Sequence, residues 1–161
     1  MGALADVRDY LTAATRSFQD VLGERLLALY LCGSLVQNDF HARQSDIDLL
    51  GVVSGALDDD TRDQLVSQLS HEASPVPARG LEVVLFSADA VRAPHADFPF
   101  VFALSTGRDG ASEYEPPGTA DDMLIDIALC REAGVALAGP PAAAMFAPIP
   151  RSLLLHALIQ E

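Results

Sequence analysis

The chain has 161 residues, half of them hydrophobic, and a formal net charge of −13; all ten of its basic residues are arginine. The length suits one domain rather than two, and the hydrophobic content excludes a disordered chain. The negative charge repels nucleic-acid phosphates and favours a cationic small molecule as a partner, although an acidic surface also serves solubility. No apolar run is long enough to span a membrane and no signal peptide opens the chain, so we expect a cytoplasmic protein.

The first elements are a helix and a buried strand. Residues 3–22 carry apolar side chains at helical spacing, and Gly23 suits the position just after the end of a helix. The continuous apolar run 26–32 predicts a buried strand, which Gly33-Ser34 ends. Cys32 belongs to this run and Cys130 to a later apolar stretch, so both are predicted to be buried thiols in a reducing compartment.

Two more strands and a helix follow. Residues 35–45 are polar and predict a short helix and a loop. Residues 46–53 alternate acidic and aliphatic side chains before becoming wholly apolar, as in a central strand. Residues 57–73 predict an amphipathic helix with an acidic first turn, and residues 81–86 predict a third strand.

The C-terminal part is predicted with fewer strands. Residues 98–104 predict another strand or an apolar edge, and residues 107–118 predict a mobile loop because they are rich in Gly, Pro and acidic residues. Residues 120–133 and 151–160 predict helices, the second of them preceded by Pro150. We assign residues 1–140 to one domain, with 141–161 as a connector and the start of a C-terminal helical region that the chain does not contain.

The segment most informative about chemistry is Asp46-Ile47-Asp48-Leu49. Side chains two residues apart on a strand share a face, so Asp46 and Asp48 are expected to project together while Ile47 and Leu49 are buried on the other face. Two carboxylates on one face repel each other, and a divalent cation relieves that repulsion. Because no His or Cys accompanies these hard oxygen ligands, the pattern predicts Mg²⁺ rather than Zn²⁺.

A turn and a third acid complete the predicted site. Gly33 allows the backbone to approach phosphate groups closely, and the hydroxyl and backbone N–H groups of Ser34 can donate hydrogen bonds to them. Glu82 is the only charged residue in the apolar strand 81–86, where a carboxylate is costly unless a metal or donor meets it. It either completes the metal site with Asp46 and Asp48 or acts as a general base on an incoming hydroxyl group.

Other polar residues have a weaker case. Arg43 and Ser45 lie close enough in sequence to bind phosphate, yet a solvated arginine and a serine at the start of the strand are the simpler interpretations. The cluster at 58–60 is interpreted as structural, because acids stabilise the N-terminus of a helix. Among Asp121, Asp122 and Asp126 one could face a cationic substrate, although most acids on such helices are solvated.

The run from Gly33-Ser34 to Ser45-Asp46-Ile47-Asp48-Leu49-Leu50 resembles the signature of the DNA-polymerase-β-like nucleotidyltransferases. More narrowly, the chain resembles the N-terminal domain of the aminoglycoside adenylyltransferases that act on streptomycin and spectinomycin. The stretches Leu81-Glu82-Val83, 126–129, 135–140 and 146–150 support the narrower resemblance.

This resemblance implies an α+β fold with a mixed, twisted β-sheet flanked by helices. It implies transfer of AMP from MgATP to a hydroxyl group of an aminoglycoside-like molecule, with Asp46 and Asp48 as metal ligands, Glu82 as base, and Ser34 in contact with the triphosphate. The partners so implied are ATP and a cationic acceptor.

The chain departs from this pattern in two ways. It has no Trp, which streptomycin-modifying members carry in the segment corresponding to 104–118, and it ends near the point where a helical domain would close the cleft. Two alternatives therefore stay open: an antitoxin-like nucleotidyltransferase that modifies a partner protein, and an inactive nucleotide-binding domain. Exposed apolar surface at the end of the chain would favour a dimer or a helical partner domain.

Overall fold

The computed structural model describes residues 2–96, 98–114 and 122–160. Within these residues, six strands form one mixed sheet in the order β5-β4-β3-β2-β1-β6. The strands are β1 Leu26–Cys32, β2 Ile47–Val53, β3 Gly80–Ser87, β4 Phe102–Gly107, β5 Gly110–Tyr114 and β6 Val135–Ala138. Strands β2 and β3 are parallel, and the other neighbouring pairs are antiparallel.

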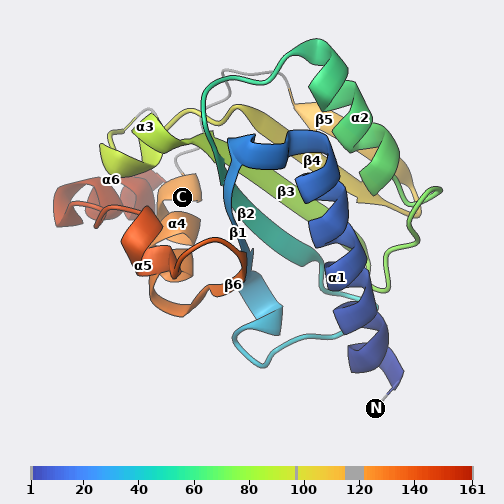
Figure 1. Cartoon of the computed structure of the whole chain (residues 1–161). Helices are drawn as coiled ribbons and strands as arrows, with labels where there is room; N and C mark the ends of the chain where they lie inside the picture. The colour runs from blue at the N-terminus through green and yellow to red at the C-terminus, as the bar shows by residue number, and fades with distance from the viewer. Residues whose placement is uncertain (1, 97, 115–121, 161) are drawn as a thin grey trace.

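Helices cover both faces of this sheet (Figure 1). The α-helices are α1 Gly2–Leu22, α2 Asp59–Leu69, α3 Ala88–Arg92, α4 Asp122–Ala133, α5 Ala142–Met145 and α6 Arg151–Gln160, and the 3-10 turns are η1 Gly23–Arg25 and η2 Gly33–Leu35. α1 and α2 lie on one face and α3 to α6 on the other (Figure 1). The fold is therefore the predicted α+β arrangement of a mixed sheet flanked by helices.

The alternation of side chains along β2 divides the core into two layers. Ile47 and Leu49 are buried against α1 and α2, as predicted, whereas Leu50 and Val52 are buried on the opposite face. Since side chains alternate along a strand, Asp48 projects on the same face as Leu50, toward α4. The hydrophobic residues of β2 thus fix the direction in which the carboxylate points.

Several helix ends are set by single residues. Gly23 has φ +56°, a left-handed conformation that suits the residue after the end of α1. The Asp58 side chain accepts a hydrogen bond of 2.8 Å from the Thr61 N–H and caps α2, which confirms the structural interpretation of the cluster at 58–60. α2 is shorter than the predicted helix 57–73, and α6 has the predicted bounds.

The main difference from prediction lies in the segment expected to be a mobile loop. Gly110–Tyr114 is instead strand β5, which forms a tight hairpin with β4 through the Gly107↔Gly110 pair. The remainder of that predicted loop, 115–118, and the first two residues of the predicted helix 120–133 lie outside the described residues. β6 and the short helices α3 and α5 were not predicted. β6 pairs with β1, and Ala142 and Phe146, at the two ends of α5, are buried in the core on the α4 side.

In the described part of the chain, no helix is both long and apolar enough to cross a membrane.

Candidate active site

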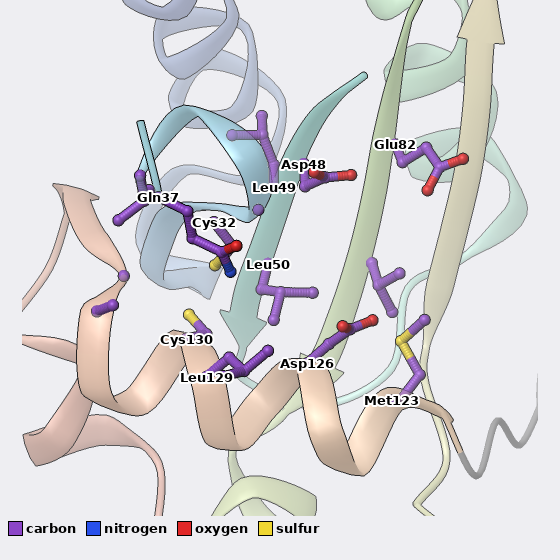
Figure 2. Close-up of a pocket in the computed structure, with 15 residues that line it drawn as sticks. Cys32, Gln37, Asp48, Leu49, Leu50, Glu82, Met123, Asp126, Leu129 and Cys130 are labelled. Carbon is purple, nitrogen blue, oxygen red and sulfur yellow. The ribbon is translucent and has the colours of Figure 1, made fainter. Parts of the chain in front are cut away.

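Two of the predicted acids stand side by side on the central parallel strands. Asp48 of β2 and Glu82 of β3 are register partners, and both project on the face covered by α4 (Figure 2). Glu82 is exposed, whereas Asp48 is partly buried. The parallel pairing therefore brings together two carboxylates that are far apart in the sequence.

The predicted Gly-Ser turn meets Asp48 directly. Cys32, the last residue of β1, pairs with Asp48, and the chain then turns through Gly33 with φ +69°. A Cβ atom on Gly33 would lie 1.9 Å from Oδ2 of Asp48. The carboxylate therefore occupies the space that any other residue at position 33 would need, so both the conformation and the contact require glycine.

Replacing this glycine gives a first testable prediction. In Gly33→Ala, strain at positive φ and displacement of the Asp48 carboxylate are expected to lower the free energy of unfolding by roughly 1–3 kcal/mol. Urea denaturation measures this loss, with Gly55→Ala as control: Gly55 also has positive φ, but nothing lies within 4 Å of its Cβ position. Equal losses in the two variants would show that the contact with Asp48 contributes nothing.

Asp46 lies just before β2 and its carboxylate is bound by an arginine. Nε of Arg79 donates to Oδ1 of Asp46 at 3.0 Å, and Nη2 donates to Oδ2. Arg79 was not predicted from the sequence, because its position beside Asp46 depends on the register between β2 and β3. The signal available in the sequence was the positive charge of Arg79 itself, directly before the strand that carries Glu82.

A cavity of about 170 Å³ lies over the two paired acids, between the sheet and α4. Asp126 of α4 lines it together with Asp48 and Glu82, and Figure 2 shows its carboxylate on the side of α4 that faces the strands. Asp126 is therefore an acid of this helix that reaches the cavity; Asp121 and the side chain of Asp122 lie outside what the structure describes. The free, buried thiols of Cys32 and Cys130 line the same cavity, in agreement with the prediction of buried thiols.

The crowding of acids raises their pKa values. Burial, followed by the charges of Glu82, Asp46 and Asp126, raises the pKa of Asp48 from 3.8 to about 7, and Arg79 opposes this shift. Partial burial and the charges of Asp46 and Asp126 also raise the pKa of Glu82. The site is therefore short of positive charge and suits a cation.

The remaining predicted residues, Ser34, Ser45 and Arg43, differ in their hydrogen bonding and exposure. The hydroxyl oxygen of Ser34 is buried and has no hydrogen-bond partner among the described residues, so it has a donor to spare. Ser45 Oγ instead accepts a hydrogen bond of 3.1 Å from the His41 N–H and stabilises the preceding turn. Arg43 is exposed in the turn formed by residues 42–44. Within the described part of the chain, no ion pair joins it to the acids.

The three predicted ligands are of the chemical type that a hard divalent cation prefers, since Asp46, Asp48 and Glu82 supply only carboxylate oxygens. Beside them lie the backbone of Gly33, which carries no side chain, and the hydroxyl of Ser34, which has no hydrogen-bond partner among the described residues. Among the residues that the structure describes, however, no three His, Cys, Asp or Glu side chains are gathered closely enough to hold a metal ion. The Arg79 guanidinium donates to both oxygens of Asp46.

The fold matches that of a solved adenyltransferase. The structure superposes with a TM-score of 0.79 on spectinomycin adenyltransferase AAD(9) from Enterococcus faecialis, solved with ATP and spectinomycin; the match covers 96% of this chain and 65% of that one, at 18% identity. No protein-family model matches the chain.

Curated relatives make the resemblance more specific. Aminoglycoside (3'') (9) adenylyltransferases from Shigella flexneri and Escherichia coli are each 34% identical over 163 residues, or 96% of this chain. A third, from Rhizobium radiobacter, is 36% identical over 124 residues, covering 71% of this chain and 45% of its own length. The predicted resemblance to the aminoglycoside adenylyltransferases is thus confirmed, and the chain spans about three-fifths of the length of the first two relatives.

Proposed function

We propose that the chain is the nucleotide- and metal-binding part of an adenylyltransferase, which transfers AMP from MgATP to a hydroxyl group of a cationic, aminoglycoside-like acceptor. The observation that carries this proposal is the pairing of Asp48 with Glu82 on adjacent parallel strands, beside the turn at Gly33 and Ser34. The names of the relatives supply the acceptor class.

Each residue has a distinct role in the proposed reaction. Asp46 and Asp48 would hold Mg²⁺, which neutralises charge on the triphosphate when it is bound. The backbone at Gly33 and the hydroxyl of Ser34 donate hydrogen bonds to phosphate oxygens. Glu82 accepts the proton of the acceptor hydroxyl as that oxygen bonds to the α-phosphorus, while the bond from the α-phosphorus to pyrophosphate breaks.

The acidic cavity accounts for a cationic acceptor. Asp126 and Glu82 face the space in which an acceptor hydroxyl would meet the α-phosphate, and ammonium groups lower the cost of crowding these carboxylates. The net charge of −13 adds a long-range attraction for cations. Arg43 and Ser45 are left with accessory roles at most, since Ser45 is already hydrogen-bonded within its turn.

The proposal is tested with the purified chain, MgATP and either spectinomycin or streptomycin. Mass spectrometry of the drug should reveal one added AMP, and a coupled assay should detect an equal amount of pyrophosphate. If MgATP binds but neither drug is modified, the activity assigned to this chain is wrong. AMP found instead on a co-expressed partner protein would support the antitoxin-like alternative.

The role of Ser34 gives a second prediction. Ser34→Ala should lower the affinity for MgATP roughly tenfold by removing a donor to a charged phosphate oxygen. Because the buried hydroxyl has no hydrogen-bond partner among the described residues, the same change should raise the free energy of unfolding by about 1 kcal/mol. Calorimetry and urea denaturation measure the two effects, with the exposed Ser67→Ala on α2 as control. A loss of stability together with unchanged affinity would contradict a phosphate contact.

A further inference from the structure

The Asp46 carboxylate is held by both ends of the Arg79 guanidinium fork. Nε donates to Oδ1 at 3.0 Å and Nη2 donates to Oδ2, so both carboxylate oxygens are engaged. The Asp46 side chain is only 12% exposed, whereas that of Arg79 is 63% exposed. Two parallel bonds of this kind fix the orientation of a carboxylate as well as neutralising it.

The backbone sets this pair, rather than the reach of a long side chain. The N–H of Arg79 donates to the carbonyl of Ser45 at 3.1 Å, immediately before the parallel ladder that begins at Ile47↔Leu81. A Cβ on Gly80 would lie 3.0 Å from Oδ1 of Asp46, so the carboxylate packs closely against this glycine. Arg79 and Asp46 are therefore neighbours in any state that keeps the β2–β3 register.

Asp46 is bound to Arg79 and, among the described residues, is not gathered closely enough with Asp48 and Glu82 to hold an ion. An ion that uses an oxygen of Asp46 must compete with a hydrogen bond that Arg79 already makes. Arg79 has room to leave, because it lines an open hollow of about 360 Å³ together with Glu82, Thr106 and Arg108. Its positive charge also lowers the pKa values of Asp48 and Glu82, which shows that it offsets repulsion among the acids.

We propose that Arg79 is a placeholder cation: it holds Asp46 in the metal-free protein and is displaced from that carboxylate when a divalent cation binds. This inference rests on the proposed function, which assigns Asp46 to the metal. Arg79 is thus a positioning residue that keeps Asp46 oriented toward Gly80 at the start of β3 and limits the affinity of the site for divalent ions.

The first test compares two variants that remove the same charge from the same hollow. Arg79→Gln loses the fork on Asp46, whereas Arg108→Gln changes an arginine that lines the hollow but has no bond to Asp46. Titration with Mn²⁺, followed by the electron paramagnetic resonance of the free ion, should show that Arg79→Gln binds roughly tenfold more tightly than the wild type. Arg108→Gln should change the affinity by less than about threefold, as expected for an exposed charge.

A double-mutant cycle distinguishes the release of the Asp46 carboxylate from the general effect of removing a positive charge near the site. In an Asp46→Asn background, Arg79→Gln should no longer tighten Mn²⁺ binding, because there is no carboxylate left to release. The inference is overturned if Arg79→Gln binds Mn²⁺ no better than Arg108→Gln, or if its effect persists in full without Asp46.

The second test uses the unmodified chain, so it does not depend on the folding of any variant. The Nε–H resonance of Arg79 is followed by NMR during titration with Mg²⁺, with that of Arg108 as internal control. Displacement should shift the Arg79 signal and speed its exchange with water, together with shifts at the amides of Gly33 and Asp48. If those amides respond while the Arg79 signal does not, the placeholder role alone fails. If nothing in the chain responds, the proposed metal site fails, and the placeholder role fails with it.

Discussion

Asp48→Asn is expected to abolish Mg²⁺-dependent ATP binding while making the metal-free protein more stable. Asp48 is the proposed metal ligand at the centre of the site, next to Glu82 in the sheet and against Gly33. Loss of its charge should lower the affinity for MgATP by at least roughly 100-fold, the upper range seen when even the supporting residues of a metal site are removed. Calorimetry with and without Mg²⁺ measures this loss, and Asp89→Asn, an exposed acid on α3, is the control.

The gain in stability follows from the raised pKa of Asp48. The folded chain holds the proton up to a pKa of about 7, whereas the unfolded chain releases it near 3.8. Between these values the folded state binds more protons, so the contribution of Asp48 to stability falls as the pH rises through this window. Above pH 7 the cost of the ionised group is fully present, and below about pH 4 it is absent.

Asparagine removes this cost because it cannot ionise. After allowance for solvent screening of a partly exposed group, Asp48→Asn should raise the free energy of unfolding by roughly 1–2 kcal/mol at pH 8 without divalent ions. The difference from the wild type should disappear near pH 4. Urea denaturation at the two pH values decides the matter: a variant that is less stable than the wild type at pH 8 would show that Asp48 makes stabilising contacts instead of bearing an uncompensated charge.

The central strands and their acids were predictable because local patterns determine them. The continuous apolar run at 26–32 indicated a strand buried on both faces. The acid–aliphatic alternation at 46–49 and the single acid at Glu82 indicated strands with carboxylates on one face. The common face of Asp48 and Glu82 depends in addition on the parallel register that pairs them. The turn at Gly33-Ser34 was also evident from the sequence, but its contact with the Asp48 carboxylate was not.

The elements that were missed depend on pairing between distant segments or on weak local signals. β6 has only four residues, two of them exposed, and its pairing with β1 across more than a hundred residues leaves no periodic trace. β5 was mistaken for a loop because the glycines, prolines and acids of residues 107–118 outweighed the Asp109-Gly110 dipeptide, which is a hairpin signal. Arg79 was missed for a related reason, since only the parallel register of β2 and β3 brings it to Asp46.

The site therefore combines residues of two kinds. Asp48, Glu82 and Gly33 are recognisable from their own segments, whereas Arg79 and the orientation of Asp126 emerge from tertiary structure. Arg43 and Ser45 show that closeness in sequence to Asp46 is not enough to predict a site residue, because neither has an observed contact with the acids. Ser45 is hydrogen-bonded within its turn, and Arg43 is exposed in the turn at 42–44.

Glu82→Gln is expected to separate the two roles that the sequence leaves open for this acid. If Glu82 is the general base, the variant should transfer AMP roughly 10²–10⁴-fold more slowly, because an amide cannot accept the proton of the attacking hydroxyl. Its affinity for MgATP should change by less than about threefold, since Asp46 and Asp48 still bind the ion. The exposure of Glu82 on the sheet face, beside the more buried Asp48, favours this role.

Two further measurements make this prediction decisive. The rate of the wild type should rise with pH as Glu82 ionises, with its midpoint above the ordinary pKa of a glutamate, and Glu82→Gln should lose this dependence. Asp126→Asn removes the same charge from the same cavity without removing the base, so it should keep the pH dependence even if its rate or its affinity for the acceptor changes. If Glu82→Gln instead loses MgATP affinity as severely as Asp48→Asn, Glu82 is a metal ligand, and the proton of the acceptor must be taken by another group.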